Sequence, residues 1–114
     1  MRIWHPIPPI CLDDKALLGE HRELHCIWTV LTEGKKGYSR HPETRRWFGR
    51  EKRLFERHEL LVAEMRARGW KHHSPIDPGE VTEYRDWPEV IEPVTEMRAR
   101  LAAKIKARRK DKLA

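Results

Sequence analysis

The sequence predicts an all-α fold, a compact single domain of about three helices joined by long ordered loops. Three stretches carry apolar residues at the spacing of an amphipathic helix, and no stretch alternates convincingly as a β-strand would. A chain of 114 residues has room for one domain with a modest core. We therefore treat residues 1–114 as a single domain, with the basic tail at about 106–114 as a candidate for disorder.

The first helix is predicted to run from Asp13–Asp14, which can cap its start, to about Glu33, where Gly34 can end it. It follows a proline-rich extended segment, residues 5–10. Its apolar positions form one stripe: Leu17, Leu24, Ile27, Trp28 and Leu31. Glu23 lies about 100° round the helix from Leu24, at the edge of this stripe. A carboxylate there is partly desolvated yet reachable, as general acid–base chemistry requires, although a plain solvated glutamate is the alternative.

The remaining elements follow from the same spacing. A loop at residues 34–43 precedes a short helical turn around 44–48. The clearest helix spans about Arg50–Arg68 and ends at Gly69, with one face made by Leu54, His58, Leu61 and Met65. Four prolines within residues 69–93 exclude a long element there. The last helix is predicted over about residues 94–110, with its apolar side made by Met97, Leu101 and Ile105.

Charge is distributed in blocks along the chain. Residues 34–53 hold eight Lys and Arg against two Glu, and residues 97–114 hold eight against one Asp. Between them, residues 76–96 hold seven acids against one Arg. A polyanion would be drawn to the basic blocks, but solvated helix faces explain the same pattern, so charge permits nucleic-acid binding without selecting it.

No apolar run is long enough for a membrane span or a signal peptide. The two cysteines, Cys11 and Cys26, are expected to be reduced, buried thiols.

The histidines offer weaker signals. His21 and His25 have the four-residue spacing that can hold zinc, but a zincin motif needs Glu directly after the first His, and Glu23 is about 200° from His21. We therefore predict no metal site. His58 is expected to be a hydrogen-bonded core histidine, and the adjacent His72 and His73 an exposed loop pair. Most of the five tryptophans are expected in the core.

Residues 17–24, LLGEHREL, resemble the catalytic helix of the pyrimidine-dimer DNA glycosylase/AP lyase family, the phage enzymes that excise UV photoproducts. The opening MRI, the stretch LFERHELLVAEMRARGW at 54–70, EYR at 83–85 and RLAAKI at 100–105 extend the resemblance over most of the chain. MRIWHP and RGWKHHSP look closer to a little-studied cellular branch of the family. The resemblance implies a compact all-α fold.

The resemblance also implies roles for individual residues. The nucleophile would be the N-terminal α-amine and its partner Glu23. Phage members expose a small residue after Met removal, whereas the bulk of Arg2 should retain Met1 here. An arginine expected after the glutamate is replaced by Cys26, with His25 beside it, and the aromatic C-terminal segment of the phage members is replaced by a basic tail. The expected DNA-binding residues are Arg2, Arg22, His25, Lys35, Lys36, Arg100 and Lys104.

The expected function is a DNA repair glycosylase with AP lyase activity, acting on UV pyrimidine dimers through an imine and β-elimination, with no metal or organic cofactor. One alternative is a lyase for abasic sites or a glycosylase for another modified base. Another is a helical protein that binds DNA without catalysis. The expected partner is double-stranded DNA, with no membrane association, and the protein is expected to be a monomer in the cytoplasm, associated with the nucleoid.

Overall fold

The computed structural model describes residues 2–34, 40–72, 74–77, 79, 86–88 and 92–113, and within these ranges it contains helices and no strand. The predicted all-α fold is confirmed. The elements in chain order are the 3₁₀ turn η1 (Pro9–Cys11), α1 (Asp14–Glu33), α2 (Pro42–Arg46), α3 (Glu51–Ala67) and α4 (Val94–Leu113). Helix α4 thus continues through most of the basic tail.

The ends of α1 form as its sequence predicts. The carboxylate of Asp13 accepts a hydrogen bond from the Ala16 N–H at 3.0 Å, which satisfies one of the unpaired donors of the first turn. At the other end, Gly34 adopts the left-handed conformation with φ 66° and donates its N–H to the Val30 carbonyl. The caps therefore fix the length of the helix that carries LLGEHREL.

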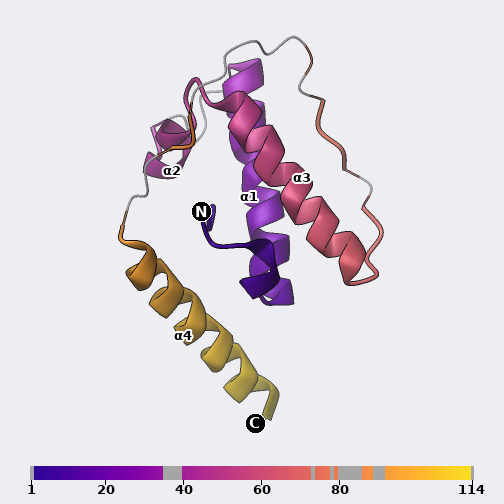
Figure 1. Cartoon of the computed structure of the whole chain (residues 1–114), viewed down its shortest axis with the longest axis vertical. Coiled ribbons are helices and arrows are strands. Elements are labelled where there is room, and N and C mark those ends of the chain that lie inside the picture. The colour runs from indigo at the N-terminus through magenta and orange to yellow at the C-terminus, as the bar shows by residue number, and fades with distance from the viewer. Residues whose placement is uncertain are drawn as a thin grey trace.

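Helices α1 and α3 lie side by side, and η1 packs against α3 (Figure 1). Their predicted apolar stripes face each other in one core, where Leu17, Leu24, Leu54 and Leu61 have no exposed surface. Trp4, Trp28 and Trp47 are buried in or beside this core, and the partly buried Trp70 and Trp87 pack against it. The expectation that the tryptophans are mostly structural is confirmed.

A buried ion pair crosses the α1–α3 interface. Arg57 donates to both carboxylate oxygens of Glu20, from Nε at 2.7 Å and from Nη2 at 2.8 Å. Its third nitrogen donates to the Ile7 carbonyl at 2.8 Å, and the Trp4 N–H donates to Glu20 at 2.9 Å. Because both side chains are almost fully buried, these bonds must replace the water that the charges have lost. The pair therefore joins α1, α3 and the N-terminal segment.

Helix α4 lies apart from the α1–α3 pair in Figure 1, on the side of the N-terminus. It contributes the buried side chains Met97 and Leu101 to the core. Near its other end, Arg108 makes two hydrogen bonds to the carboxylate of Asp13, the N-cap of α1. Burial raises the pKa of Asp13, but the Arg108 and Ala16 hydrogen bonds outweigh it and leave that pKa below its ordinary value. The cap of α1 is thereby also the attachment point of α4.

The two cysteines are free thiols. The expectation that both are buried is wrong for Cys11, which is exposed because it lies in the surface turn η1, where no residue is buried. Cys26 is half-buried on α1. Across the described ranges, no helix is long and apolar enough to cross a membrane.

Replacing Arg57 or Glu20 singly with Leu should lower the free energy of unfolding by about 3–5 kcal/mol, because the remaining charge is left buried without its partner. The double variant should cost at least about 2 kcal/mol less than the sum, since it leaves no lone charge. Urea unfolding of the four proteins measures this coupling. The more exposed pair Arg53–Glu56, 2.9 Å apart, is the control and should couple by less than about 1 kcal/mol. Equal coupling in the two cycles would contradict this role for the buried pair.

Candidate active site

Glu23 lines a cleft of about 190 Å³ between α1, α4 and the N-terminal segment. Arg2 and Trp4 enter this cleft from the N-terminus, and Lys104 enters it from α4. The side chain of Glu23 is half-buried, as its position at the edge of the apolar stripe predicts. Two of the predicted DNA-binding residues, Arg2 and Lys104, thus lie in one cleft with the predicted catalytic carboxylate.

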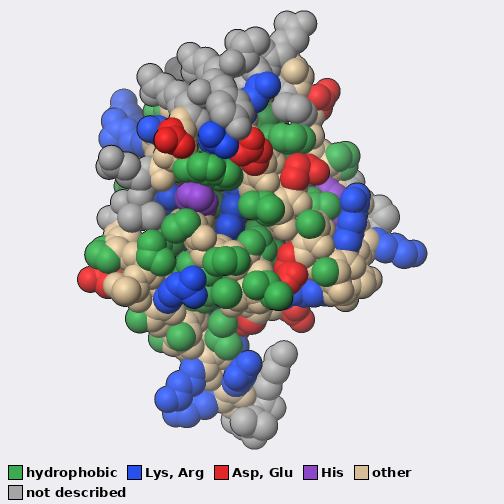
Figure 2. All heavy atoms as spheres, in the orientation of Figure 1, with side chains coloured by type: hydrophobic (Ala, Val, Ile, Leu, Met, Phe, Trp, Pro, Cys, Tyr) green, Lys and Arg blue, Asp and Glu red, His purple; other side chains and the backbone are tan. Residues whose placement is uncertain are grey.

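A larger cleft of about 710 Å³ adjoins the first. Lys15, Gly19 and Arg108 line both, so the two form one continuous groove between α1 and α4. The predicted DNA contact Arg22 is exposed on the wall of the larger cleft. The groove is therefore bordered by basic side chains from both helices, and Figure 2 shows Lys and Arg side chains gathered over the far end of α4.

Gly19 forms part of the floor of this groove. A glycine inside a helix is about 1 kcal/mol less favourable than alanine. A Cβ at Gly19 would meet nothing within 4 Å, so packing does not require the glycine. Gly19 leaves this turn of α1 without a side chain in the groove. Lys15, Gly19 and Glu23 follow one another at intervals of four, so the sequence itself places them on one face of α1.

Two of the predicted DNA-binding arginines are held by one acid. Glu92 accepts from Arg2 Nη1 at 2.6 Å and from Arg100 Nε at 2.9 Å. The guanidinium of Arg2 also lies 4.9 Å from the ring centroid of Trp4, and the ammonium of Lys104 lies 5.4 Å from the same ring. The Trp4 ring thus lies close to two cations that line the smaller cleft, and Glu92 links one of them, Arg2, to Arg100 on α4.

Some predicted site residues lie outside the described residues: Met1, Lys35, Lys36, His73 and the stretch 83–85. Their predicted roles stay predictions.

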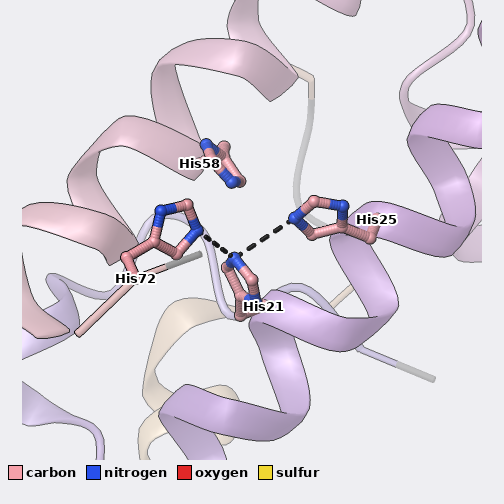
Figure 3. Close-up of side chains that lie close together, drawn as sticks. All are labelled: His21, His25, His58 and His72. Atoms are coloured by element: carbon pink, nitrogen blue, oxygen red, sulfur yellow. Dashed lines mark hydrogen bonds between the residues drawn. The ribbon is translucent and has the colours of Figure 1, made fainter. Parts of the chain in front are cut away.

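The opposite face of α1 carries a cluster of histidines. The Nε2 atom of His21 lies 2.9 Å from Nε2 of His72 and 3.2 Å from Nε2 of His25 (Figure 3). His58, on α3, is fully buried, and its ring centroid is 5.1 Å from those of both His21 and His25. Burial, and then the neighbouring imidazoles, lower the pKa of His21 to about 4 and hold the pKa of His25 below its ordinary value. These two rings are therefore neutral near pH 7.

This cluster changes two sequence-based interpretations. His72 is not part of an exposed loop pair, because it is half-buried and its ring contacts His21. His25, predicted to bind DNA, has its ring in the cluster, about 200° around α1 from Glu23. The prediction of no metal site rested on the His21–His25 pair alone. In the folded chain, His58 and His72 lie beside that pair, so four histidines form one group.

A family model described as pyrimidine dimer DNA glycosylase matches residues 1–78, more than half of the chain. The match includes LLGEHREL and the stretch 54–70, and it ends before the resembling stretches at 83–85 and 100–105. No curated protein and no solved structure matches.

Glu92 should compete with DNA phosphates for Arg2 and Arg100. Replacing Glu92 with Gln removes the negative charge between them, so affinity for any duplex should rise about three- to tenfold at low salt and fall more steeply with added salt. Fluorescence anisotropy over a salt series measures both. Glu96→Gln is the matched control, because Glu96 is exposed on α4 and the structure gives it no bond to either arginine. If the two substitutions changed DNA affinity equally, Glu92 would not be competing with DNA for Arg2 and Arg100.

Proposed function

Because this chain belongs to the pyrimidine dimer DNA glycosylase family, and is by that membership a DNA repair glycosylase, we propose that it also cleaves the DNA strand as an AP lyase. In this proposal it excises UV pyrimidine dimers through an imine with the α-amine of Met1, with Glu23 as the acid–base partner. The observation that carries the proposal is the cleft in which Arg2 and Glu23 lie together.

The position of Arg2 supports the choice of nucleophile. Arg2 lines the cleft and is bonded directly to residue 1, which is the reason for choosing the α-amine of residue 1 as the nucleophile. An α-amine has a pKa of about 8, roughly two units below that of a lysine side chain. A useful fraction is therefore an unprotonated nucleophile at pH 7 without further activation.

Each bond and proton in the proposed reaction is accounted for by the amine, the DNA, water and the acid–base partner, without an added cofactor. The amine nitrogen forms a bond to C1′ of the deoxyribose as the glycosidic bond breaks. The base leaves with the electron pair of that bond and takes up a proton, while the attached nitrogen loses one. Opening of the sugar ring breaks the C1′–O4′ bond, O4′ takes up a proton, and C1′ and the nitrogen form an imine. Loss of a proton from C2′ then expels the 3′ phosphate by β-elimination. Hydrolysis of the imine releases the enzyme.

Glu23 has two tasks in this scheme. Its carboxylate stabilises the positive charge that develops on the sugar and on the protonated imine. It also carries protons to O4′ and from C2′. Half-burial in a small cleft suits both, since the charge acts in a medium of lower dielectric than water while substrate can still reach it.

The surroundings of the cleft fit a duplex with an extruded nucleotide. Exposed basic residues of α4 and Arg22 offer contacts to phosphates, which position DNA without reading its sequence. The larger cleft, about 710 Å³, has the size of a small-molecule site and lies directly beside Glu23's cleft. We assign it to the nucleotide that must leave the base stack before the amine can reach C1′.

Two lysines are alternative amines. Lys15 and Lys104 line the same cleft as Glu23, and the unprotonated amine of either could form an imine. The tests must therefore separate the α-amine from these side chains.

Glu23→Gln should retain duplex binding but lose strand cleavage by about 10²–10⁴-fold, because the amide neither carries a proton nor offsets a positive charge. Nicking is measured on UV-irradiated, abasic and undamaged duplexes, which also identifies the lesion. Glu33→Gln is the matched control, an exposed glutamate at the end of the same helix. Near-wild-type nicking by Glu23→Gln would remove this carboxylate from the mechanism.

A peptide tag left ahead of Met1 should abolish borohydride trapping on abasic DNA. The tag turns the amine into an amide, whose lone pair is delocalised and cannot attack C1′, while every lysine stays unchanged. The trapped complex is measured as a covalent protein–DNA band on a denaturing gel.

The control is the same protein after specific proteolytic removal of the tag, which should trap again. Thermal unfolding of both forms must agree, so that a loss of trapping cannot come from unfolding. Trapping by the tagged, folded protein would shift the assignment to Lys15 or Lys104.

A further inference from the structure

Four histidines from three separate parts of the chain converge on one point. His21 and His25 come from α1, His58 from α3, and His72 from the segment that follows α3 (Figure 3). One ring nitrogen of each lies within 4.8 Å of the corresponding nitrogen of every other. The cluster lies on the face of α1 away from Glu23, and the reaction proposed above uses none of its members.

Hydrogen bonding between the rings does not satisfy every one of these nitrogens. A neutral imidazole nitrogen carries either one N–H or one lone pair. Nε2 of His21 nevertheless faces two other Nε2 atoms, at 2.9 Å and 3.2 Å, so it can form only one well-directed bond. His58 Nε2 is buried and has no hydrogen-bond partner among the described residues. Leaving such a group unpaired costs about 1–3 kcal/mol.

A metal ion at the centre would satisfy all four nitrogens. Zinc–imidazole bonds are about 2.0–2.1 Å long, so a tetrahedral site places its nitrogens about 3.3 Å apart. Two of the separations in the cluster, 2.9 Å and 3.2 Å, are already close to this value. The other nitrogens lie within 4.8 Å of one another, and rotation of the side chains would have to bring them to bonding distance.

The outer nitrogen of one ring is already oriented. His58 Nδ1 lies 3.0 Å from a carboxylate oxygen of Glu59, the arrangement that fixes the tautomer of a zinc-binding histidine and leaves Nε2 for the metal. This contact leaves the lone pair of His58 on Nε2, as a ligand of a metal site requires.

We propose that His21, His25, His58 and His72 bind one Zn²⁺ ion with a structural role. Four protein ligands close the coordination sphere and leave no position for water or substrate, which distinguishes a structural zinc site from a catalytic one. The ion cross-links α1 to α3 and fastens the segment around His72 to both. It takes no part in the imine chemistry.

Four imidazole nitrogens favour zinc over the other common metal ions. Neutral imidazoles suit zinc, copper, iron and nickel, whereas magnesium and calcium require oxygen ligands. Zinc has no geometric preference from its d electrons, so it accepts the arrangement that two packed helices impose. Elemental analysis of the purified protein identifies the ion directly.

The test uses the untagged full-length chain, because a polyhistidine tag would itself bind zinc. Protein stripped with a chelator is titrated with Zn²⁺ alone, followed by calorimetry and by thermal unfolding. One ion per chain should bind, and the midpoint of unfolding should rise with the zinc concentration. Co²⁺ in place of Zn²⁺ should give the intense visible absorption of a tetrahedral nitrogen site.

Two variants should weaken zinc binding to different extents. His72→Gln removes a ligand from outside the helices, where the fold is least at risk, and should weaken zinc binding by about 100-fold or more. Glu59→Ala removes only the outer partner of His58 and should weaken it by about 10-fold. His5→Phe is the matched control, since His5 lies outside the cluster and stacks on Trp87. It should bind as the wild type does.

Circular dichroism of each variant shows that its helices are retained. A wild-type chain that takes up no Zn²⁺, or that binds it no more tightly than His72→Gln, would overturn the proposal. So would equal losses in His72→Gln and His5→Phe.

Discussion

The buried contact between Glu20 and Arg57 sets the arrangement of everything around it. Neither charge is tolerable alone in an apolar core, so α1 and α3 must pack in the register that joins them. The same two side chains bind the backbone of Trp4 and Ile7, which draws the N-terminal segment across both helices. The position of Arg2 in the cleft beside Glu23 is a consequence of that crossing.

The ion pair also positions the histidines, because His21 follows Glu20 directly and His58 follows Arg57. Bringing the charged residues together therefore also brings these two rings together, with their centroids 5.1 Å apart. Glu23 and His21 are about 200° apart around α1, so one helix presents a carboxylate to the groove and imidazoles to α3. This separation allows a metal to stabilise the fold without entering the proposed reaction.

The sequence predicted the helices well, because their apolar spacing and caps are local properties: Asp13, Gly34 and Gly69 lie at or next to the helix ends as expected. It also placed Glu23 correctly at the edge of the stripe. The buried pair was missed although each member occupies a core position, Glu20 three residues after Leu17 and Arg57 three after Leu54. The histidine cluster could not be read from spacing, since it depends on which helices pack together and on where the chain returns after α3.

The central claim is that the N-terminal α-amine attacks the sugar beside Glu23. Mapping the covalent adduct tests this most directly. Wild-type, untagged protein is trapped on abasic DNA with borohydride and digested, and the peptide that carries the sugar remnant is identified by mass spectrometry. The account predicts the adduct on the α-amine of Met1. An adduct on Lys15 or Lys104, which line the same cleft, would contradict it.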